Sequence, residues 1–400
     1  MDSQRTRLDV QVSPHRLLNW LIEDACPLWS TRGVDSVLGG FQELLNGEEP
    51  VVAPRRARVQ PRQVAAFIGA ARLGWPGDAA ELAVHGLSYL RAYYRRSDGL
   101  FRTLIAPDGR VIDDRALLYD QTFVLLGLAE SDPLLKGSAA SPSKLPPMEE
   151  ARALRELIYL HFGRKQPGHA GSGLEMPGFE SAVEGHMPLS ANAHMHLFEA
   201  SLACRDGDAD PKWRALVDSI GELALTYFIH PESGALREHF DSNWVPSPGT
   251  EGRLLEPGHH FEWAWLLLRW VGESRADARQ AALRLIDIAE RHGVREGVTV
   301  NTLLDDFSIH DACARLWPQT ERLKAAALAA RLTGESRYSS IATEAAETIW
   351  RYLQTPVRGS WYDRLMPYGR FIEEPAPAST FYHLVGAISE WTRLHQPGKS

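Results

Sequence analysis

The chain has 400 residues, of which 44% are hydrophobic and 24% are charged, and its formal net charge is −8. This balance argues against a surface for nucleic acid or for an anionic membrane, and no apolar run approaches the roughly 18 residues that cross a bilayer. The N-terminus lacks the apolar stretch of a secretory signal, and the three widely spaced cysteines suit a reducing compartment. We therefore expect a cytoplasmic protein without nucleic-acid or membrane partners.

About a dozen segments carry apolar residues at helical spacing. In chain order they cover residues 17–22, 64–71, 82–94, 117–129, 151–162, 194–204, 213–228, 261–271, 276–292, 323–332, 341–353 and 381–394. Pro27 is expected to interrupt the first of them. A dozen helices is the number required for six helical hairpins.

Glycine-marked turns recur at intervals of roughly 60 residues, a period typical of stacked or ring-arranged units. They read Gly39-Gly40-Phe41, Asp98-Gly99-Leu100, Ser172-Gly173-Leu174, Ser233-Gly234-Ala235, Glu296-Gly297-Val298 and Arg358-Gly359-Ser360. Helical segments with polar residues near their starts follow, around Arg62, Tyr119, Asn192, His259, Asp311 and His383. The short alternating segments beside the turns indicate β-hairpins at one end of the ring. Residues 131–148, rich in Ser and Pro, are expected to form a flexible insertion in a single domain covering residues 1–400.

Most familiar catalytic motifs are absent. The sequence contains no Walker-type phosphate loop, no Gly-x-Ser-x-Gly elbow and no His-Glu-x-x-His or Cys-x-x-Cys pair. His194 and His196 are two residues apart on a predicted helix and point in different directions. The adjacent His259 and His260 also point in different directions, so neither pair is suited to bind one metal ion. We therefore predict no metal site and no cofactor.

The segment PGHHFEWAWLLLRW places His259 and Glu262 one turn apart at the start of an apolar helix. They are within hydrogen-bonding reach, and a carboxylate beside an imidazole fixes its tautomer and raises its basicity, as a general base requires. A purely structural pair at the positive end of the helix is the alternative. Pro257-Gly258 is expected to leave room for a ligand at this helix start.

Other polar residues lie at similar places in apolar helices. Asn192, His196 and Glu199 share one helix face, although a satisfied core histidine is the alternative there. His383 falls in the first turn of a helix that Ser379 or Thr380 can cap, and alone it would more often belong to the core. Arg62 opens an apolar stripe, where an arginine must be paired or face a cavity.

Seven strings together resemble the N-acylglucosamine 2-epimerase superfamily, in order from about residue 15 to 395. They are Gly39-Gly40-Phe41-x-Glu43, VQPRQVAAF, LLYDQTFVLLGLAE, NAHMHLFEA, EPGHHFEWAWLLLRW, RLWPQTE and ASTFYHLVGAISE. The resemblance implies an all-α fold, an (α/α)6 barrel, and metal-free chemistry at C1 and C2 of a monosaccharide. It implies acid/base roles for His259 and His383, contact of Arg62 with substrate oxygens near the reacting carbons, and sugar binding by His196. Glu262 joins the catalytic group, and Tyr119, Asn192 and Trp317 match pocket residues.

The STFYHL helix is more similar to the aldose–ketose isomerase branch, which implies interconversion of D-mannose and D-fructose through a cis-enediolate. The alternative is a 2-epimerase of the mannose/glucose, cellobiose or N-acylglucosamine type, and monomer and homodimer both stay open. A ring-shaped binding or regulatory protein without catalysis is disfavoured by the joint presence of His259, Glu262, His383 and Arg62. A charged substrate would need a basic cluster, but the run Arg55, Arg56 and Arg58 is expected to be solvated.

Overall fold

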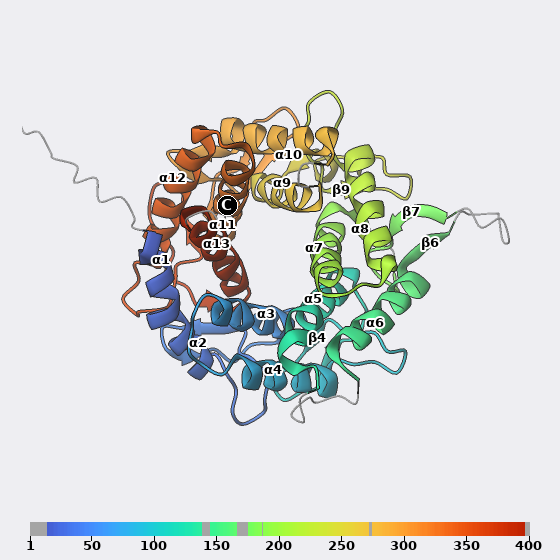
Figure 1. Ribbon diagram of the computed structural model, residues 1–400, viewed down its shortest axis with the longest axis vertical. Coiled ribbons are helices and arrows are strands. Elements are labelled where there is room, and N and C mark those ends of the chain that lie inside the picture. Colours follow the sequence, from blue (N-terminus) through green and yellow to red (C-terminus); the bar gives the residue numbers. More distant parts are fainter. Residues whose placement is uncertain (1–13, 138–144, 166–174, 186, 272–273, 397–400) are drawn as a thin grey trace, which may run out of the picture.

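The computed structural model describes residues 14–137, 145–165, 175–185, 187–271 and 274–396. Its helices form two concentric rings (Figure 1). The inner ring consists of α3 (Val59–Arg72), α5 (Leu118–Leu135), α7 (Ala191–Gly207), α9 (Pro257–Val271), α11 (Leu316–Thr333) and α13 (Ser379–His395). Each inner helix contacts the next, and α13 contacts α3, so the ring is closed. The predicted (α/α)6 barrel is confirmed.

The outer ring covers the inner one, with one outer helix against each inner helix. It consists of α1 (Pro14–Trp20) continued by α2 (Cys26–Thr31), α4 (Ala79–Tyr93), α6 (Pro147–Phe162), α8 (Pro211–Leu223), α10 (Ala276–Ile288) and α12 (Ser336–Leu353). One π-helical turn joins α1 to α2 (Leu21–Ala25), and two others extend α8 (Ala224–Phe228) and α10 (Ala289–Gly293). A single 3₁₀ turn (Glu251–Arg253) precedes α9.

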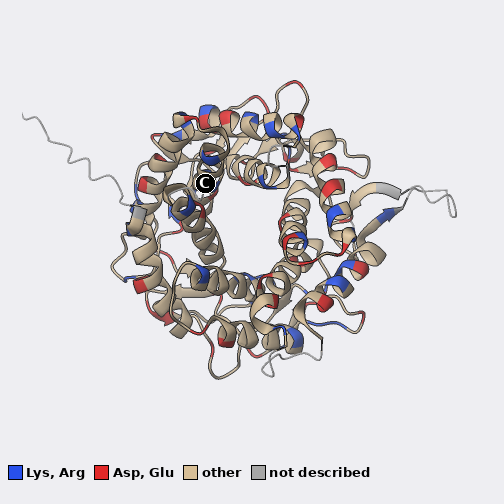
Figure 2. Ribbon diagram, in the orientation of Figure 1, with Lys and Arg blue, Asp and Glu red and all other residues tan. Residues whose placement is uncertain are grey.

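The burial patterns explain why each helix takes its ring. On α12, buried residues such as Tyr338, Ala342 and Ile349 recur at helical spacing along one stripe, which is the pattern of a surface helix. On α11, residues from Pro318 to Ala330 are buried on every side, polar ones included. Figure 2 shows the consequence: charged residues gather on the outer helices, and only a few lie on the inner ring.

Short strands accompany the starts of the inner helices. They are β1 (Leu44–Asn46), β2 (Glu49–Pro50), β3 (Arg55–Arg56), β4 (Leu104–Ile105), β5 (Val111–Asp113), β6 (Gly163–Lys165), β7 (Glu175–Phe179), β8 (Leu189–Ser190), β9 (His239–Phe240), β10 (Leu254–Leu255), β11 (Val294–Arg295), β12 (Val298–Thr299), β13 (Thr302–Leu304), β14 (Ile309–Asp311), β15 (Ala314–Arg315), β16 (Arg364–Leu365) and β17 (Ala376–Pro377). They form seven small antiparallel sheets among the described residues. The β-hairpins therefore lie at the end of the barrel predicted for them.

The backbone before each inner helix pairs with the following hairpin unit. Five of these pairings are strand pairs, β3–β4, β8–β9, β10–β13, β15–β16 and β17–β1, and the sixth is the bridge between Leu117 and Ala182. In the β17–β1 pair, Leu44 lies opposite Pro377, so the last unit pairs with the first. The ring is thus closed twice, by helix packing and by backbone hydrogen bonds.

In five inner helices, a first-turn side chain hydrogen-bonds to the backbone just after a glycine turn. We call this contact a clamp. Gln121 accepts from the Phe101 N–H at 2.9 Å and donates to its carbonyl at 2.8 Å. Gln60 and Gln319 clamp Phe41 and Thr299 in the same way. On α7 and α9 a histidine replaces the glutamine: Nε2 of His194 accepts from Phe179, and Nε2 of His260 accepts from Leu236. Both histidines are therefore part of the scaffold.

The clamps also locate the turn of the third unit. Phe179 follows Gly178, whose φ of 84° is in the left-handed region, so Gly178-Phe179 is equivalent to Gly40-Phe41. The predicted turn Ser172-Gly173-Leu174 lies outside the described residues. A Cβ at Gly40 would lie 2.4 Å from the Tyr89 ring, so this position needs glycine for space as well as for conformation.

Other sequence expectations need correction. The first helix does not stop at Pro27, because the π turn before it shifts the hydrogen bonds and Pro27 lies in the first turn of α2, where an N–H is dispensable. Asp311 ends β14, and the fifth inner helix begins only at Leu316. Within 131–148, α5 continues to Leu135 and α6 begins at Pro147, while residues 138–144 lie outside the described part.

No helix among the described residues is both long and apolar enough to cross a bilayer.

Candidate active site

All eight residues predicted for the site line one pocket of about 260 Å³ at the N-terminal ends of the inner helices. They are Arg62, Tyr119, Asn192, His196, His259, Glu262, Trp317 and His383. The rest of the lining is Arg56, Arg58, Glu256, Arg315, Ser379 and Thr380. Because every inner helix starts at the same end of the ring, residues in their first turns converge on one axis.

His259 lies in the first turn of α9 and is 5% exposed. Its Nδ1 donates to Oε2 of Glu238 at 2.9 Å, and Oε2 of Glu256 lies 3.7 Å away. Burial alone would lower the pKa of this imidazole, but the charges of Glu238 and Glu256 raise it well above its ordinary value. His259 is therefore protonated at neutral pH.

His383 lies on α13, across the pocket, and is 6% exposed. Its Nδ1 donates to Oε1 of Glu321 at 2.8 Å. Burial, together with the positive charges of Arg62 and Lys324, lowers the pKa of His383 well below its ordinary value. His383 is therefore neutral at pH 7, and the Nδ1–Glu321 bond leaves Nε2 as the free acceptor.

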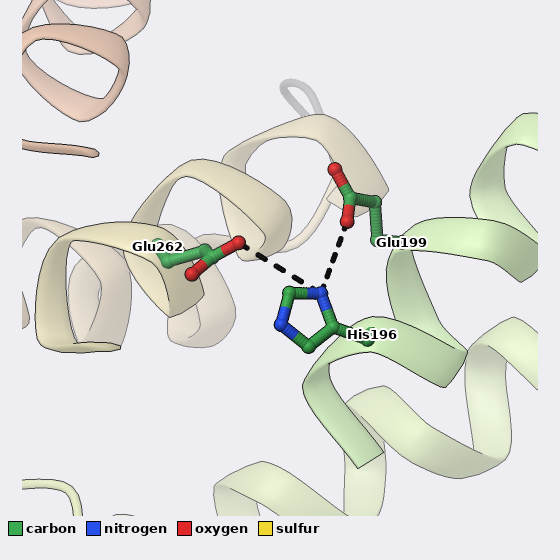
Figure 3. A group of neighbouring side chains, drawn as sticks. All are labelled: His196, Glu199 and Glu262. Carbon is green, nitrogen blue, oxygen red and sulfur yellow. Dashed lines mark hydrogen bonds and ion pairs between the residues drawn. The ribbon is translucent and has the colours of Figure 1, made fainter. Parts of the chain in front are cut away.

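His196 lies beside two acidic residues, Glu199 and Glu262 (Figure 3). The Nδ1 of His196 is 3.2 Å from Glu199 of the same helix and 4.0 Å from Glu262 of α9. Burial lowers the pKa of His196 to about 3, with Arg62 and His383 adding to the effect. Burial and the charges of Glu321 and Glu199 raise the pKa of Glu262 well above its usual range, which favours its neutral form.

The expected hydrogen bond between His259 and Glu262 is wrong. Glu262 turns toward the barrel axis and His196, whereas His259 turns toward Glu238, which precedes β9. Spacing on one helix could not find Glu238, because it comes from another element 21 residues away. The predicted orientation of an imidazole by a carboxylate is present, with a different carboxylate.

Arg62 is buried in an aromatic box. Its Nη2 donates to the Tyr119 hydroxyl at 2.9 Å, and its guanidinium lies 3.9 Å from the Phe123 ring centroid. Among the described residues no carboxylate lies within ion-pair distance of Arg62. Its charge is therefore available to the pocket.

Trp317 lies between the two catalytic candidates, with ring centroids 5.1 Å from His259 and 5.9 Å from His383. A Cβ at Gly258 would come within 2.5 Å of the Trp317 ring. The space expected for a ligand at Pro257-Gly258 is thus filled by this indole. Asn192 completes the wall, and its buried Oδ1 has no hydrogen-bond partner among the described residues.

The arginine run before α3 is not the solvated stretch that was expected. Arg55 is buried and pairs with Asp35. Arg56, paired with Glu43, and Arg58, 3.1 Å from Asp120, both line the pocket. Arg315 joins them from β15. Like the other three arginines, Arg315 is ion-paired, with Asp363 at 3.2 Å.

The comparisons with known proteins agree with this geometry. The family model described as N-acylglucosamine 2-epimerase (GlcNAc 2-epimerase) matches residues 39–387. The chain belongs to this family. The family makes it a carbohydrate isomerase or epimerase with a small-molecule sugar as substrate, as the sequence resemblance implied.

Several proteins similar to this chain are named as sugar isomerases or epimerases. The chain is 44% identical over 397 residues to a mannose-6-phosphate isomerase of Rhizobium meliloti (strain 1021), covering 96% of this chain and 97% of the relative. It is 28% identical over 318 residues to a D-mannose isomerase of Thermobifida fusca, covering 74% and 73%. A solved cellobiose 2-epimerase from Bacillus thermoamylovorans B4167 has a TM-score of 0.81 at 17% identity, covering 95% and 99% of the two chains, and shares the fold.

Three groups of described side chains, two of which share Glu262, have the spacing of metal ligands. They are His196 with Glu199 and Glu262, His259 with Glu238 and Glu256, and His383 with Glu262 and Glu321. Hydrogen bonds within the groups already account for much of this closeness. In addition, the Lys324 ammonium lies 2.7 Å from Glu321 and supplies a cation to two of the groups. The absence of a metal stays a prediction.

Proposed function

We propose that this family member is an aldose–ketose isomerase that interconverts D-mannose and D-fructose through a cis-enediolate, without metal or cofactor. The observation that carries the proposal is the pair formed by His259 and His383. Each imidazole is held at Nδ1 by a carboxylate, yet their pKa values are moved in opposite directions. When the pKa values of two neighbouring titratable groups are shifted in opposite directions, one group can act as the acid and the other as the base.

The neutral His383 is the base. Its Nε2 takes the proton from C2 of the open-chain aldose, the C2–H electron pair forms the C1–C2 double bond, and the carbonyl O1 becomes an oxyanion. Return of the proton from His383 to C1, with transfer of the O2 proton to O1, gives the ketose. Arg62 stabilises the oxyanion, an effect worth roughly 3–4 kcal/mol for one well-placed donor.

The protonated His259 is the acid. It donates a proton to the ring oxygen as the pyranose opens and takes the proton that the O1 hydroxyl releases when the C1 carbonyl forms. A histidine that stays charged at neutral pH suits this step. Glu262, as a neutral acid, and Asn192, with an unpaired buried oxygen, offer further hydrogen bonds to the sugar hydroxyls.

The 2-epimerase alternative uses the same residues and differs in where the enediolate is reprotonated. The likeness of the STFYHL helix and the isomerase names of two relatives support the isomerase. The test is proton NMR of mannose turnover in D2O. We expect fructose to appear first, with deuterium at C1. Glucose appearing first, with deuterium at C2 and no fructose, would replace the proposal with the 2-epimerase.

A phosphorylated substrate is the second candidate, and the arginines at the pocket favour it. Arg56, Arg58 and Arg315 line the pocket together with Arg62. A guanidinium has five donors, so an arginine held by one carboxylate can still bind phosphate oxygens. The name of the 44% identical relative supports this candidate as well.

The test compares kcat/KM for mannose and for mannose 6-phosphate in the wild type, Arg56→Gln and Arg315→Gln. Arg115→Gln is the matched control, because Arg115 is ion-paired at the same end of the barrel but lies outside the pocket lining. If phosphate binds here, both pocket variants lose turnover of the phosphorylated sugar selectively. Equal turnover of the two sugars, unchanged by either variant, would contradict this candidate.

A further inference from the structure

A lysine is buried at the centre of the barrel, below the candidate site. Lys324 lies on the inner helix α11, and its side chain is 2% exposed. Its ammonium is 2.7 Å from Oε2 of Glu321 and 3.9 Å from the ring centroid of Trp265 on α9. It also lines a second cavity of about 370 Å³, whose other residues come largely from the C-terminal halves of the inner helices.

Carboxylates on three inner helices act on this ammonium. Burial would lower the pKa of Lys324, but the charges of Glu321, Glu262 and Glu199 raise it above its ordinary value. Lys324 therefore stays charged. Among these acidic groups, Glu321 has the direct ion pair to Lys324, whereas Glu199 accepts a hydrogen bond from Tyr382 of α13.

Glu321 joins Lys324 to His383. Its Oε1 accepts from Nδ1 of His383 at 2.8 Å, and its Oε2 faces the ammonium. Glu321 is fully buried, and burial raises the pKa of its carboxyl above its ordinary value, although the charge of Lys324 limits this rise. Without the ammonium, burial would favour the protonated carboxyl more strongly.

We propose that Lys324 is a positioning residue for His383: it holds Glu321 as a carboxylate that accepts the Nδ1 proton and so leaves Nε2 of His383 free to take a proton from the substrate. This inference rests on the function proposed above, because that function makes His383 the base. A protonated Glu321 would donate to the imidazole instead of accepting from it. The lone pair of His383 would then point away from the pocket.

The kinetic test is a double-mutant cycle with Lys324→Met and Glu321→Gln. Methionine keeps the volume and removes the charge. Outer partners of functional histidines contribute about 10–100-fold to activity, and we expect a loss of kcat in this range for K324M with little change in KM. If Lys324 acts through Glu321, the double variant is no slower than E321Q alone. Losses that multiply, or K324M within about threefold of wild type, would overturn the proposal.

Arg322→Met is the matched control. Arg322 is the buried, ion-paired cation two residues away on α11, but it pairs with Glu290 and Glu344 rather than with site residues. R322M should reduce stability and leave kcat per folded molecule within a few-fold. Lys324→Gln provides a second uncharged variant should K324M fold poorly, and Lys324→Arg should restore part of the activity.

Histidine ¹⁵N NMR separates this inference from the isomerase function, with the signal of His383 assigned by its loss in His383→Asn. In the wild type we expect Nδ1 protonated and Nε2 bare at neutral pH. K324M should lose this tautomer preference and R322M should keep it. An unchanged tautomer in K324M contradicts the positioning role whatever the reaction. A changed tautomer with undiminished turnover supports the positioning role and removes His383 from the mechanism.

Discussion

The histidines on the α9 side and the α13 side of the pocket make the same kind of hydrogen bond, but their pKa values are shifted in opposite directions. Both His259 and His383 donate through Nδ1 to a buried glutamate. Around His259 a second carboxylate, Glu256, adds negative charge, and its pKa is raised. Around His383 the nearby charges include Arg62 and Lys324, and its pKa is lowered.

The comparison teaches that the hydrogen-bond partner sets the tautomer while the surrounding charges set the protonation state. Desolvation alone would make both histidines neutral. What separates them is the sign of the next charge: a carboxylate on one side, cations on the other. One barrel can therefore hold an acid and a base on either side of Trp317.

The largest expected effect comes from removing either histidine. His259→Asn and His383→Asn should each lower kcat by about 10²–10⁴-fold, the usual contribution of a general acid or base, with little change in the urea midpoint. Steady-state kinetics on the substrate identified by NMR measures this. A folded variant within a few-fold of wild type would take that histidine out of the mechanism.

The neighbouring histidine supplies the control. His260→Gln should retain activity, because glutamine at this position can accept from the Leu236 N–H as Gln121 does from Phe101. A loss in H260Q as large as that in H259N would show that the scaffold, rather than proton transfer, limits turnover.

A smaller effect should separate the two sides by pH. Glu238→Gln removes the carboxylate that raises the pKa of His259, so His259 loses its proton at a lower pH. The alkaline limb of the kcat/KM profile should therefore shift to lower pH. Loss of such an orienting partner typically costs 10–100-fold in activity. Glu321→Gln should leave the alkaline limb in place, because that limb belongs to His259. Full pH profiles of both variants decide whether the two sides titrate independently.

The acid limb reports on His383. The lowered pKa of this imidazole places the limb below the ordinary histidine value of about 6.5. Activity is thus expected to persist on the acid side of neutrality and to fall once His383 gains a proton. An acid limb above that value would reverse the assignment of acid and base.

The smallest effect on activity is expected from the clamps, which support both sides equally. Gln121→Leu leaves the N–H and C=O of buried Phe101 unpaired, which should cost about 2–4 kcal/mol of stability. Gln121→His should cost less, since histidine makes the equivalent bond on α7 and α9. Urea unfolding measures both variants. Equal losses in the two would mean that the clamp contributes through packing alone.

The sequence was sufficient for the ring, because the ring follows from helical periodicity repeated over six units. The pocket lining was predicted from polar residues near the helix starts together with the family resemblance, and all eight predicted residues line the pocket.

The carboxylates that hold His259 and His383 could not be predicted from helical periodicity. Glu238 and Glu321 are 21 and 62 residues from the imidazoles they hold, and no helical spacing relates them. The arginine run was misjudged for a similar reason. The ion-pair partners of Arg56 and Arg58, Glu43 and Asp120, come from other parts of the chain, and only the fold brings them close.

The pairing of β17 with β1 has a consequence for synthesis on the ribosome. The Trp29 indole donates to Gly359, 330 residues further along the chain. Strand β1 likewise cannot pair with β17 until the last unit has been made. At about 5–20 residues per second, the nascent first unit waits roughly 15–65 s with this edge open. An unpaired strand edge is a template for aggregation. We therefore expect the newly made chain to be most vulnerable just before its C-terminal helix emerges.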